Sequence, residues 1–106
     1  MPYVIASDGT YLGDLGCSSI GNPASRFGSE VGATSIWNVV SRYGSVVSEQ
    51  SAWNPVTPRP PIIMLDGKPI GFLTVNPILI TRAIDPRRLE AFMIDRCSNP
   101  NGYRLH

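Results

Sequence analysis

The chain has 106 residues, which is enough for one domain and too short for two. Its formal net charge is +1 and only 16% of the residues are charged, so it offers no basic patch of the kind that nucleic-acid binding needs. No apolar run in the sequence approaches the roughly 20 residues that a helix needs to cross a bilayer. We therefore expect one folded domain over residues 1–106, with neither a nucleic acid nor a membrane as partner.

The cysteines and the histidine exclude several kinds of site. Cys17 and Cys97 are too far apart in sequence for a CxxC redox or zinc motif. The single histidine is His106, the last residue, so a metal site lacks ligands. We predict no metal and no cofactor. The sequence leaves open whether the cysteines pair, and two small buried thiols are the favoured interpretation.

The chain opens with a predicted β-hairpin over residues 3–15. Asp8-Gly9 is a strong tight-turn signal, because glycine adopts a positive φ without steric cost. β-branched and aromatic residues flank this turn, which predicts strands near 3–7 and 10–15.

A second hairpin is predicted over residues 61–75, where Asp66-Gly67 separates apolar strands near 61–65 and 69–75. The pattern DGxxxGxL occurs in both hairpins, which suggests that they are built alike. Gly13 and Gly71, inside the second strand of each, predict a bulge or a close backbone approach. One isolated hairpin is only marginally stable, so a four-stranded antiparallel sheet with pseudo-two-fold character is expected.

Between the hairpins, residues 18–55 contain a 16-residue repeat. SSIGNPASRFGS (18–29) aligns with TSIWNVVSRYGS (34–45), and a truncated third copy starts at Ser51. In the first copy Asn22 is a favoured N-cap, Pro23 a favoured first helical residue and Gly28 a favoured terminator. Each copy is therefore predicted to form a helix of about one turn. A single longer helix over 35–43 is the alternative for the second copy.

The repeat is too short for a solenoid, which needs at least three stacked units. We expect the copies to pack instead against one face of the sheet and to supply its core. The candidate core residues are Ile20, Phe27, Ile36, Trp37, Tyr43 and Trp53.

The last predicted element is an amphipathic helix over residues 86–96, preceded by a short strand over 78–81. Asp85 is a favoured N-cap and Pro86 a favoured first helical residue. An apolar face at helical spacing is formed by Leu89, Phe92, Met93 and Cys97. The fold class is therefore α+β: a small antiparallel sheet from two DG-turn hairpins, one-turn helices in the repeat region and one C-terminal helix.

Several of these motifs resemble those of a small, uncharacterised bacterial domain family. DGTYLG, SIWN, RYGS, SAWNP and GFLTVN, over roughly residues 7–77, are similar to its DGxYLG hairpin, its repeated SIxNPxxRYGS units and its closing G-[FY]-L-[ST]-x-N strand. Val39 and Val40 depart from the Pro-Tyr that is usual there. The resemblance implies a compact domain of exported or accessory bacterial proteins, without an assigned activity, and a mobile-cassette gene would suit it.

The residues do not assemble a catalytic motif. Nucleophilic catalysis by cysteine or serine needs a neighbouring base, usually histidine, and His106 is the only one. Asp8 and Asp66 are explained by turns, and Asp85 by a helix cap. No phosphate-binding glycine motif is present. These observations favour a protein that is not an enzyme.

A binding surface is suggested by residues at equivalent repeat positions. Arg26 and Arg42 each precede an aromatic residue, Tyr43 in the second case, and Trp37 and Trp53 are also equivalent. Arginine beside an aromatic ring can form a cation–π surface for a sugar, an aromatic ligand or a peptide. The favoured alternative is structural: the arginines donate to carbonyls at the helix ends and the aromatics fill the core.

The function that these features favour is a structural or protein-interaction module of bacterial origin. The open edges of a small sheet are commonly covered by pairing, so a homodimer or another protein is the expected partner. The alternative function is binding of a small molecule or carbohydrate through Arg, Trp and Tyr of the repeat. The N-terminus carries no basic segment followed by an apolar one, which favours the cytoplasm, whereas the family resemblance leaves export open.

Overall fold

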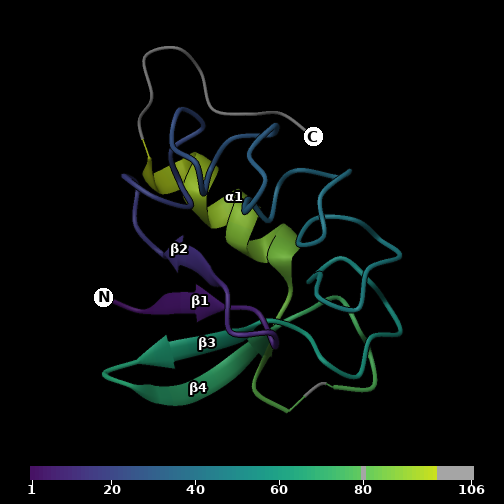
Figure 1. Cartoon of the computed structure of the whole chain (residues 1–106). Helices are drawn as coiled ribbons and strands as arrows, with labels where there is room; N and C mark the ends of the chain where they lie inside the picture. The colour runs from purple at the N-terminus through teal and green to yellow at the C-terminus, as the bar shows by residue number, and fades with distance from the viewer. Residues whose placement is uncertain (80, 98–106) are drawn as a thin grey trace.

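A computed structural model describes residues 1–79 and 81–97 of the chain. It confirms the α+β class: a five-stranded sheet is accompanied by one helix (Figure 1). The elements are β1 (Tyr3–Ile5), β2 (Tyr11–Asp14), β3 (Ile62–Leu65), β4 (Lys68–Leu73), β5 (Ala83–Ile84) and α1 (Pro86–Arg96). Within the described part of the chain, no helix is long and apolar enough to span a bilayer.

The two predicted hairpins form the first four strands of the sheet. The strand order is β2-β1-β3-β4-β5, so the hairpins pair through their first strands, β1 and β3, which run antiparallel. This matches the expected four-stranded antiparallel sheet with a pseudo-two-fold arrangement. The fifth strand, β5, was not predicted, and it runs parallel to β4, which makes the sheet mixed.

Both hairpins contain the expected turn and bulge, although their turns differ. Asp66 and Gly67 have φ angles of 51° and 78°, the two positive values of a two-residue type I′ turn. In the first hairpin the turn is longer, because Ala6 N donates to Thr10 O. The strand register shifts near Gly13 and again near Gly71, as the glycines predicted.

The strand expected over residues 78–81 is wrong for the residues that can be checked. Residue 80 lies outside the described residues, while Ile78 and Thr81 lie in turns. The chain becomes extended only at Ala83, where Phe72 N donates to Arg82 O and Thr74 N donates to Ile84 O. These hydrogen bonds place β5 along the free edge of β4. The chain then continues from β5 into α1 after a single residue, Asp85.

The C-terminal helix has the predicted bounds and the predicted cap. Asp85 has extended backbone angles, and its side chain accepts a hydrogen bond from Arg87 N. Leu89, Met93 and Cys97 are buried as expected. Phe92 is not, since half of its surface is exposed, and the Arg96 guanidinium lies over its ring instead.

The one-turn helices predicted for the repeat region are wrong. Residues 16–57 form consecutive turns in which an N–H donates to the carbonyl three residues before it. The turns of the two full copies start at corresponding residues, namely Ser19, Asn22, Ser25, Ser29 and Gly32, then Ser35, Asn38, Ser41, Ser45 and Ser48. The longer helix over 35–43 is equally absent from this described segment.

Side-chain hydrogen bonds explain why the backbone forms turns rather than a helix. The Asn22 and Asn38 carboxamide oxygens accept from the N–H two residues later, and most serines that start a turn do the same. Ser41 Oγ also donates to the carbonyls of Ser35 and Asn38. These local bonds compete with helical hydrogen bonding, which is why Ser and Asn favour turns. The sequence signals of a helix cap are thus also those of a turn.

The glycine that was predicted to end each helix has a different role. A Cβ on Gly28 would lie 1.9 Å from Asn22 O, and one on Gly44 would lie 2.0 Å from Asn38 O. Neither glycine has a positive φ. Both positions therefore require glycine because the backbone passes close to an earlier turn.

Successive copies of the repeat contact one another as well as the sheet. Trp37 Nε1 donates to Ile20 O at 2.9 Å, and Trp53 Nε1 donates to Ile36 O at 2.8 Å, so each indole reaches back to the preceding copy. This stacking was not predicted. The core predictions are confirmed: Ile20, Ile36, Trp37 and Tyr43 are buried with sheet residues, and Phe27 and Trp53 pack against them, partly buried.

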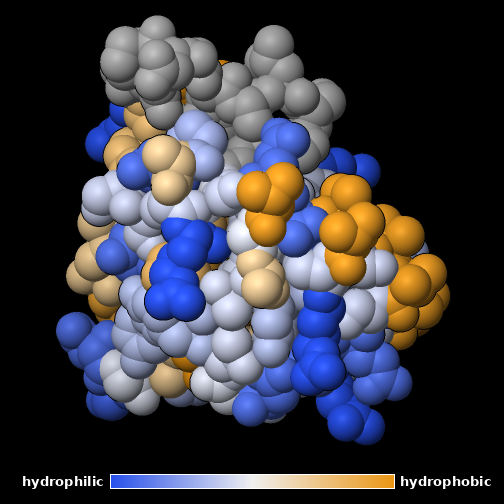
Figure 2. Space-filling view, turned by 45° about the horizontal axis from the view of Figure 1, so that its top comes forward, coloured by the Kyte–Doolittle hydropathy of each residue, from blue (hydrophilic) through white to orange (hydrophobic). Residues whose placement is uncertain are grey.

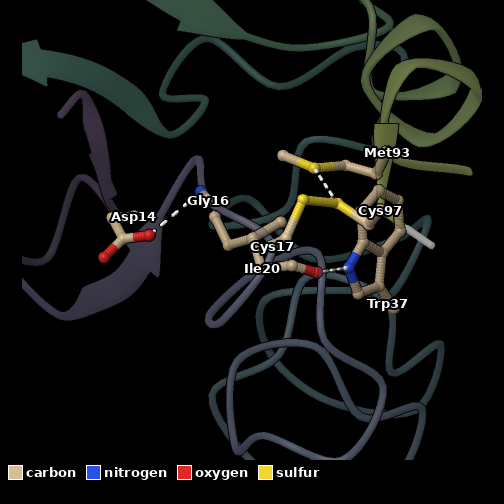
Figure 3. Close-up of a disulfide and its surroundings, with 7 residues drawn as sticks. All are labelled: Asp14, Gly16, Cys17, Ile20, Trp37, Met93 and Cys97. Carbon is tan, nitrogen blue, oxygen red and sulfur yellow. Dashed lines mark hydrogen bonds between the residues drawn. A yellow bond between two sulfur atoms is a disulfide. The ribbon is translucent and has the colours of Figure 1, made fainter. Parts of the chain in front are cut away.

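A disulfide joins Cys17 to Cys97, which overturns the favoured interpretation of two free thiols (Figure 3). Cys17 begins the turn-rich segment and Cys97 follows the last residue of α1. Figure 3 shows the bridge beside Met93 and near the Trp37 indole that bonds Ile20. The sequence spacing could not indicate this pairing, because the fold alone brings the two residues together.

Candidate functional site

The predicted binding residues separate into three groups in the structure. Trp37 and Trp53 lie together, with ring centroids 6.1 Å apart. Arg42 and Tyr43 contact the turn of the first hairpin. Arg26 lies apart from both groups, with its guanidinium 5.7 Å from the centre of the Phe27 ring. The structure therefore does not assemble one Arg-Trp-Tyr surface.

Arg42 and Tyr43 are used to hold the Asp8 turn. The Tyr43 hydroxyl donates to Asp8 Oδ2 at 2.9 Å and is hydrogen bonded to the Thr10 hydroxyl. Arg42 Nη1 lies 3.8 Å from the same carboxylate, although 68% of the Arg42 side chain is exposed. The guanidinium was expected to meet backbone carbonyls, and it instead forms an ion pair.

These contacts perturb the titration of Asp8. Burial raises the pKa of this carboxyl group, but hydrogen bonds from Thr10 and Tyr43 and the positive charge of Arg42 outweigh it. The net effect is a pKa below the ordinary value of 3.8. Asp8 is therefore ionised at neutral pH and acts as the acceptor that ties the hairpin to the repeat.

The candidate site is a pocket of about 340 Å³ between the turn-rich segment and the start of α1. Its lining consists of Trp37, Val39, Gly44, Val46, Trp53, Arg87 and Glu90. The two indoles come from equivalent repeat positions, and both use their N–H groups on backbone carbonyls. Their rings are thus held in place, and because Trp37 is almost fully buried, the aromatic surface that the pocket exposes comes mainly from the partly buried Trp53.

The helix supplies the charged wall of the pocket. Arg87 makes three side-chain hydrogen bonds to the Asp85 carboxylate. These bonds lower the pKa of Asp85 below its ordinary value of 3.8, against the opposing effect of burial. Glu90 lies one helical turn further on and is largely buried. The wall therefore carries one guanidinium held by an aspartate and one further carboxylate.

The lining is mostly apolar and carries two charged side chains. Pockets for small ligands are mostly apolar, with a few polar groups that orient the ligand, and volumes start at about 300 Å³. Among the lining residues within 1–79 and 81–97 there is no serine, cysteine or histidine. Across residues 1–79 and 81–97, no group of three or more His, Cys, Asp or Glu side chains is placed to hold a metal ion.

The turn-rich segment carries six strongly exposed valines, which we call the valine row because they follow one another along the sequence. Figure 2 shows hydrophobic side chains gathered along the side of the molecule where Figure 1 places that segment. The strongly exposed members of this valine row are Val31, Val39, Val40, Val46, Val47 and Val56. Val39 and Val46 belong to both features, since they also line the pocket.

The sequence analysis identified the two tryptophans of the pocket but not its valines or the charged residues of α1. Arg87 and Glu90 were assigned only to a helix, and nothing in their spacing indicates that they face the repeat. Val39 and Val46 gave a weak signal, because apolar residues in a turn-rich segment are unexpected unless they are buried or bind something. Only the packing of α1 against the repeat brings these residues together.

Together these features define a small α+β domain with an aromatic pocket between stacked turns and a helix. No family model, curated protein or solved structure matches the chain at a significant level. The resemblance to the uncharacterised bacterial domain family therefore stays a prediction. Any functional conclusion has to come from the pocket and the surface themselves.

Proposed function

We propose that the protein is a small-molecule-binding module whose site is the pocket between the two tryptophans and α1. The observation that supports this most strongly is the joint presence of Trp37 and Trp53 in one 340 Å³ pocket with a carboxylate and a guanidinium. Aromatic carbon surface stabilises the apolar face of a ligand. Arg87 and Glu90 supply the polar contacts that orient it.

Intrinsic fluorescence is a direct test, because the chain contains two tryptophans and both line the pocket. A metabolite and sugar library is screened for compounds that change the tryptophan emission and raise the melting temperature. We expect at least one compound to do both, since a ligand that binds only the folded state stabilises it. A library without any such compound would overturn the proposal.

Two neighbouring valines provide a matched pair of variants. Val46 lines the pocket and is 60% exposed, whereas Val47 is 83% exposed and is not part of the lining. Val46→Arg should weaken binding at least tenfold by filling the pocket, and Val47→Arg should leave it unchanged. Both side chains are largely in solvent, so neither change is expected to unfold the protein. Equal effects of the two substitutions would place the ligand elsewhere.

A second candidate function, protein interaction, is favoured by the valine row. Six valines with exposed fractions between 60% and 87% on one segment exceed what scattered surface residues explain. Analytical ultracentrifugation from 1 to about 500 μM tests the self-association that was expected from the sequence. A protein that remains monomeric over that range would contradict the homodimer.

The disulfide bears on where such a module works. Disulfides persist mainly in oxidising compartments and are rare in the cytosol. The Cys17–Cys97 bridge therefore favours a periplasmic or extracellular location over the cytoplasm that the N-terminal sequence favoured. Mass spectrometry of the protein purified from its native host without reductant tests this: two free thiols would contradict it.

A further inference from the structure

Four turns of the chain share a sequence that leaves apolar side chains in solvent. Each consists of an asparagine followed by two apolar residues: Asn22-Pro23-Ala24, Asn38-Val39-Val40, Asn54-Pro55-Val56 and Asn76-Pro77-Ile78. We call the eight apolar residues the apolar ladder. We propose that the apolar ladder is the surface through which two copies of the chain associate, an inference that rests on the second candidate function, protein interaction.

The four turns are held by the same hydrogen bond. In each, the asparagine carboxamide oxygen accepts from the N–H two residues later. In the last three turns the carboxamide nitrogen also donates to a backbone carbonyl, that of Gly32, Ser48 and Thr57 in turn. These three asparagines are buried, so each turn is fixed from the inside. A surface that is already ordered loses less entropy when it associates.

The turns follow one another along the stacked copies of the repeat. Trp37 and Trp53, one residue before the second and third turns, have ring centroids 6.1 Å apart, and each bonds to the preceding copy. Asn76 continues the series, because its carboxamide donates to Thr57 O, directly after the third turn. Figure 2 shows hydrophobic side chains gathered on this side of the molecule. The ladder is therefore one surface rather than four separate patches.

The exposure of the ladder has no explanation within the single chain. All of its residues except Pro23 are exposed, and the exposed fractions of Val40, Val56 and Ile78 are 87%, 78% and 84%. Surface turns are built mainly from Gly, Pro, Asn, Asp and Ser, so valine and isoleucine at these positions are unexpected. None of the eight ladder residues is polar or charged, which favours an apolar partner surface over a charged one.

A second copy fits the ladder in size and in spacing. At about 30 Å² of accessible surface per aliphatic carbon, the exposed part of the ladder amounts to roughly 400 Å² per copy. Two ladders would bury about 800 Å² of apolar surface, and an interface of ordinary composition with this apolar area covers about 1,400 Å², enough for a stable dimer. A two-fold axis places the ladders face to face and antiparallel, so turns with the same spacing fit between one another.

Sedimentation equilibrium between about 1 and about 500 μM tests the proposal with two matched isoleucines. Ile78 belongs to the ladder, whereas Ile70 is 44% exposed on β4, outside it. We expect the wild type to dimerise in this range. Ile78→Glu and Val56→Glu should each raise the dimer dissociation constant at least tenfold, because either change places a carboxylate in an apolar interface. Ile70→Glu should leave the constant unchanged.

Two measurements on the wild type do not depend on whether the variants fold. Dimerisation should not weaken between about 50 and about 500 mM NaCl, because the ladder is uncharged. Hydrogen exchange of peptides spanning residues 38–41 and 54–57 should slow as the protein concentration rises. Dimerisation that weakens with salt, or that leaves the exchange of these peptides unchanged, would overturn the proposal.

The outcomes separate this inference from the proposed functions. A dimer that Ile70→Glu disrupts and Ile78→Glu does not would place the interface on the sheet, which overturns the inference while protein interaction stands. A wild type that stays monomeric to about 500 μM contradicts both. Neither Val56 nor Ile78 lines the pocket, so the ligand screen tests the binding function independently of these results.

Discussion

The disulfide makes the strongest quantitative prediction about stability. Cys17 and Cys97 are 80 residues apart, so the bridge closes most of the chain into one loop. In the chain-entropy description a loop of this length loses about 15 cal/mol/K of entropy in the unfolded state, which corresponds to about 4.5 kcal/mol at 25 °C. Domains of this size are typically stable by only 5–15 kcal/mol, so reduction should remove a large share of the total.

Urea unfolding of the oxidised and reduced protein measures this effect. With a slope of about 1.5 kcal/mol/M, a loss of 4.5 kcal/mol lowers the midpoint by about 3 M. The double variant Cys17→Ser/Cys97→Ala is the control: it should unfold like the reduced protein and should not respond to dithiothreitol. Cys97 is buried and Cys17 is exposed, so alanine at Cys97 and serine at Cys17 keep each environment.

Two results would refute this reasoning. A thiol assay that finds two reactive cysteines in the oxidised folded protein would show that the bridge does not form. A midpoint shift below about 0.5 M on reduction would show that the bridge does not restrict the unfolded chain as the chain-entropy description requires.

Three further predictions concern the turns and the helix cap. Gly44→Ala should destabilise the fold by about 3 kcal/mol, because the new Cβ would lie 2.0 Å from a backbone carbonyl oxygen. Gly9→Ala, which has open space but a φ of 91°, should cost less, about 1–2 kcal/mol, and the reverse order in urea unfolding would contradict the steric explanation. Asp85→Ala should cost about 1 kcal/mol through loss of the helix cap, whereas Asp85→Asn should retain most of that stability, and equal losses would argue against capping. The pKa values of Asp8 and Asp85 are lowered in the fold, so both carboxylates stabilise it above about pH 4 and this contribution is lost as the pH falls through the unfolded and then the folded pKa. Melting temperatures measured from pH 7 to pH 2.5 should decline less steeply below pH 4 in Asp8→Asn than in the wild type.

The elements that local signals define could be predicted from the sequence. An Asp-Gly pair between apolar strands correctly predicted both hairpins, and the Asp85-Pro86 pair correctly predicted the start of α1. These signals succeed because the residues that determine each conformation are neighbours in the chain. Even the bulges near Gly13 and Gly71 follow from a single residue type.

The repeat region shows where local signals become ambiguous. Asn22 followed by proline and, later, by Gly28 describes a capped helix, but the same residues also form turns. The side chain of Ser25 decides between them, because it bonds the carbonyls of Ser19 and Asn22. The bond to Ser19 O spans six residues, and helix or turn signals within a short window do not reveal it.

Only half of the candidate site could be predicted from the sequence. Its tryptophans occupy equivalent positions of the repeat, whereas Arg87 and Glu90 reach the pocket only because α1 packs against the repeat. Equivalent positions in the three copies hold Gly21, Trp37 and Trp53. The first copy thus has glycine where the other two have tryptophan. A Cβ on Gly21 would lie 2.9 Å from both Cys97 Sγ and Met93 Sδ. The C-terminal end of α1 therefore fits against the first copy because the large side chain is missing there.

The same break in the repeat explains why the pocket lies where it does. Because α1 is held at its C-terminal end beside Gly21 and by the disulfide, its N-terminal turn faces the two copies that do carry tryptophan. Each indole is fixed by a hydrogen bond to the preceding copy, so the rings are positioned before any ligand arrives. Preorganisation of this kind reduces the entropy that binding costs. Two copies of the repeat thus stack a tryptophan on the preceding copy, and the first copy has Gly21 at that position. This one difference leaves room for α1, and the pocket forms between α1 and the two tryptophan-bearing copies.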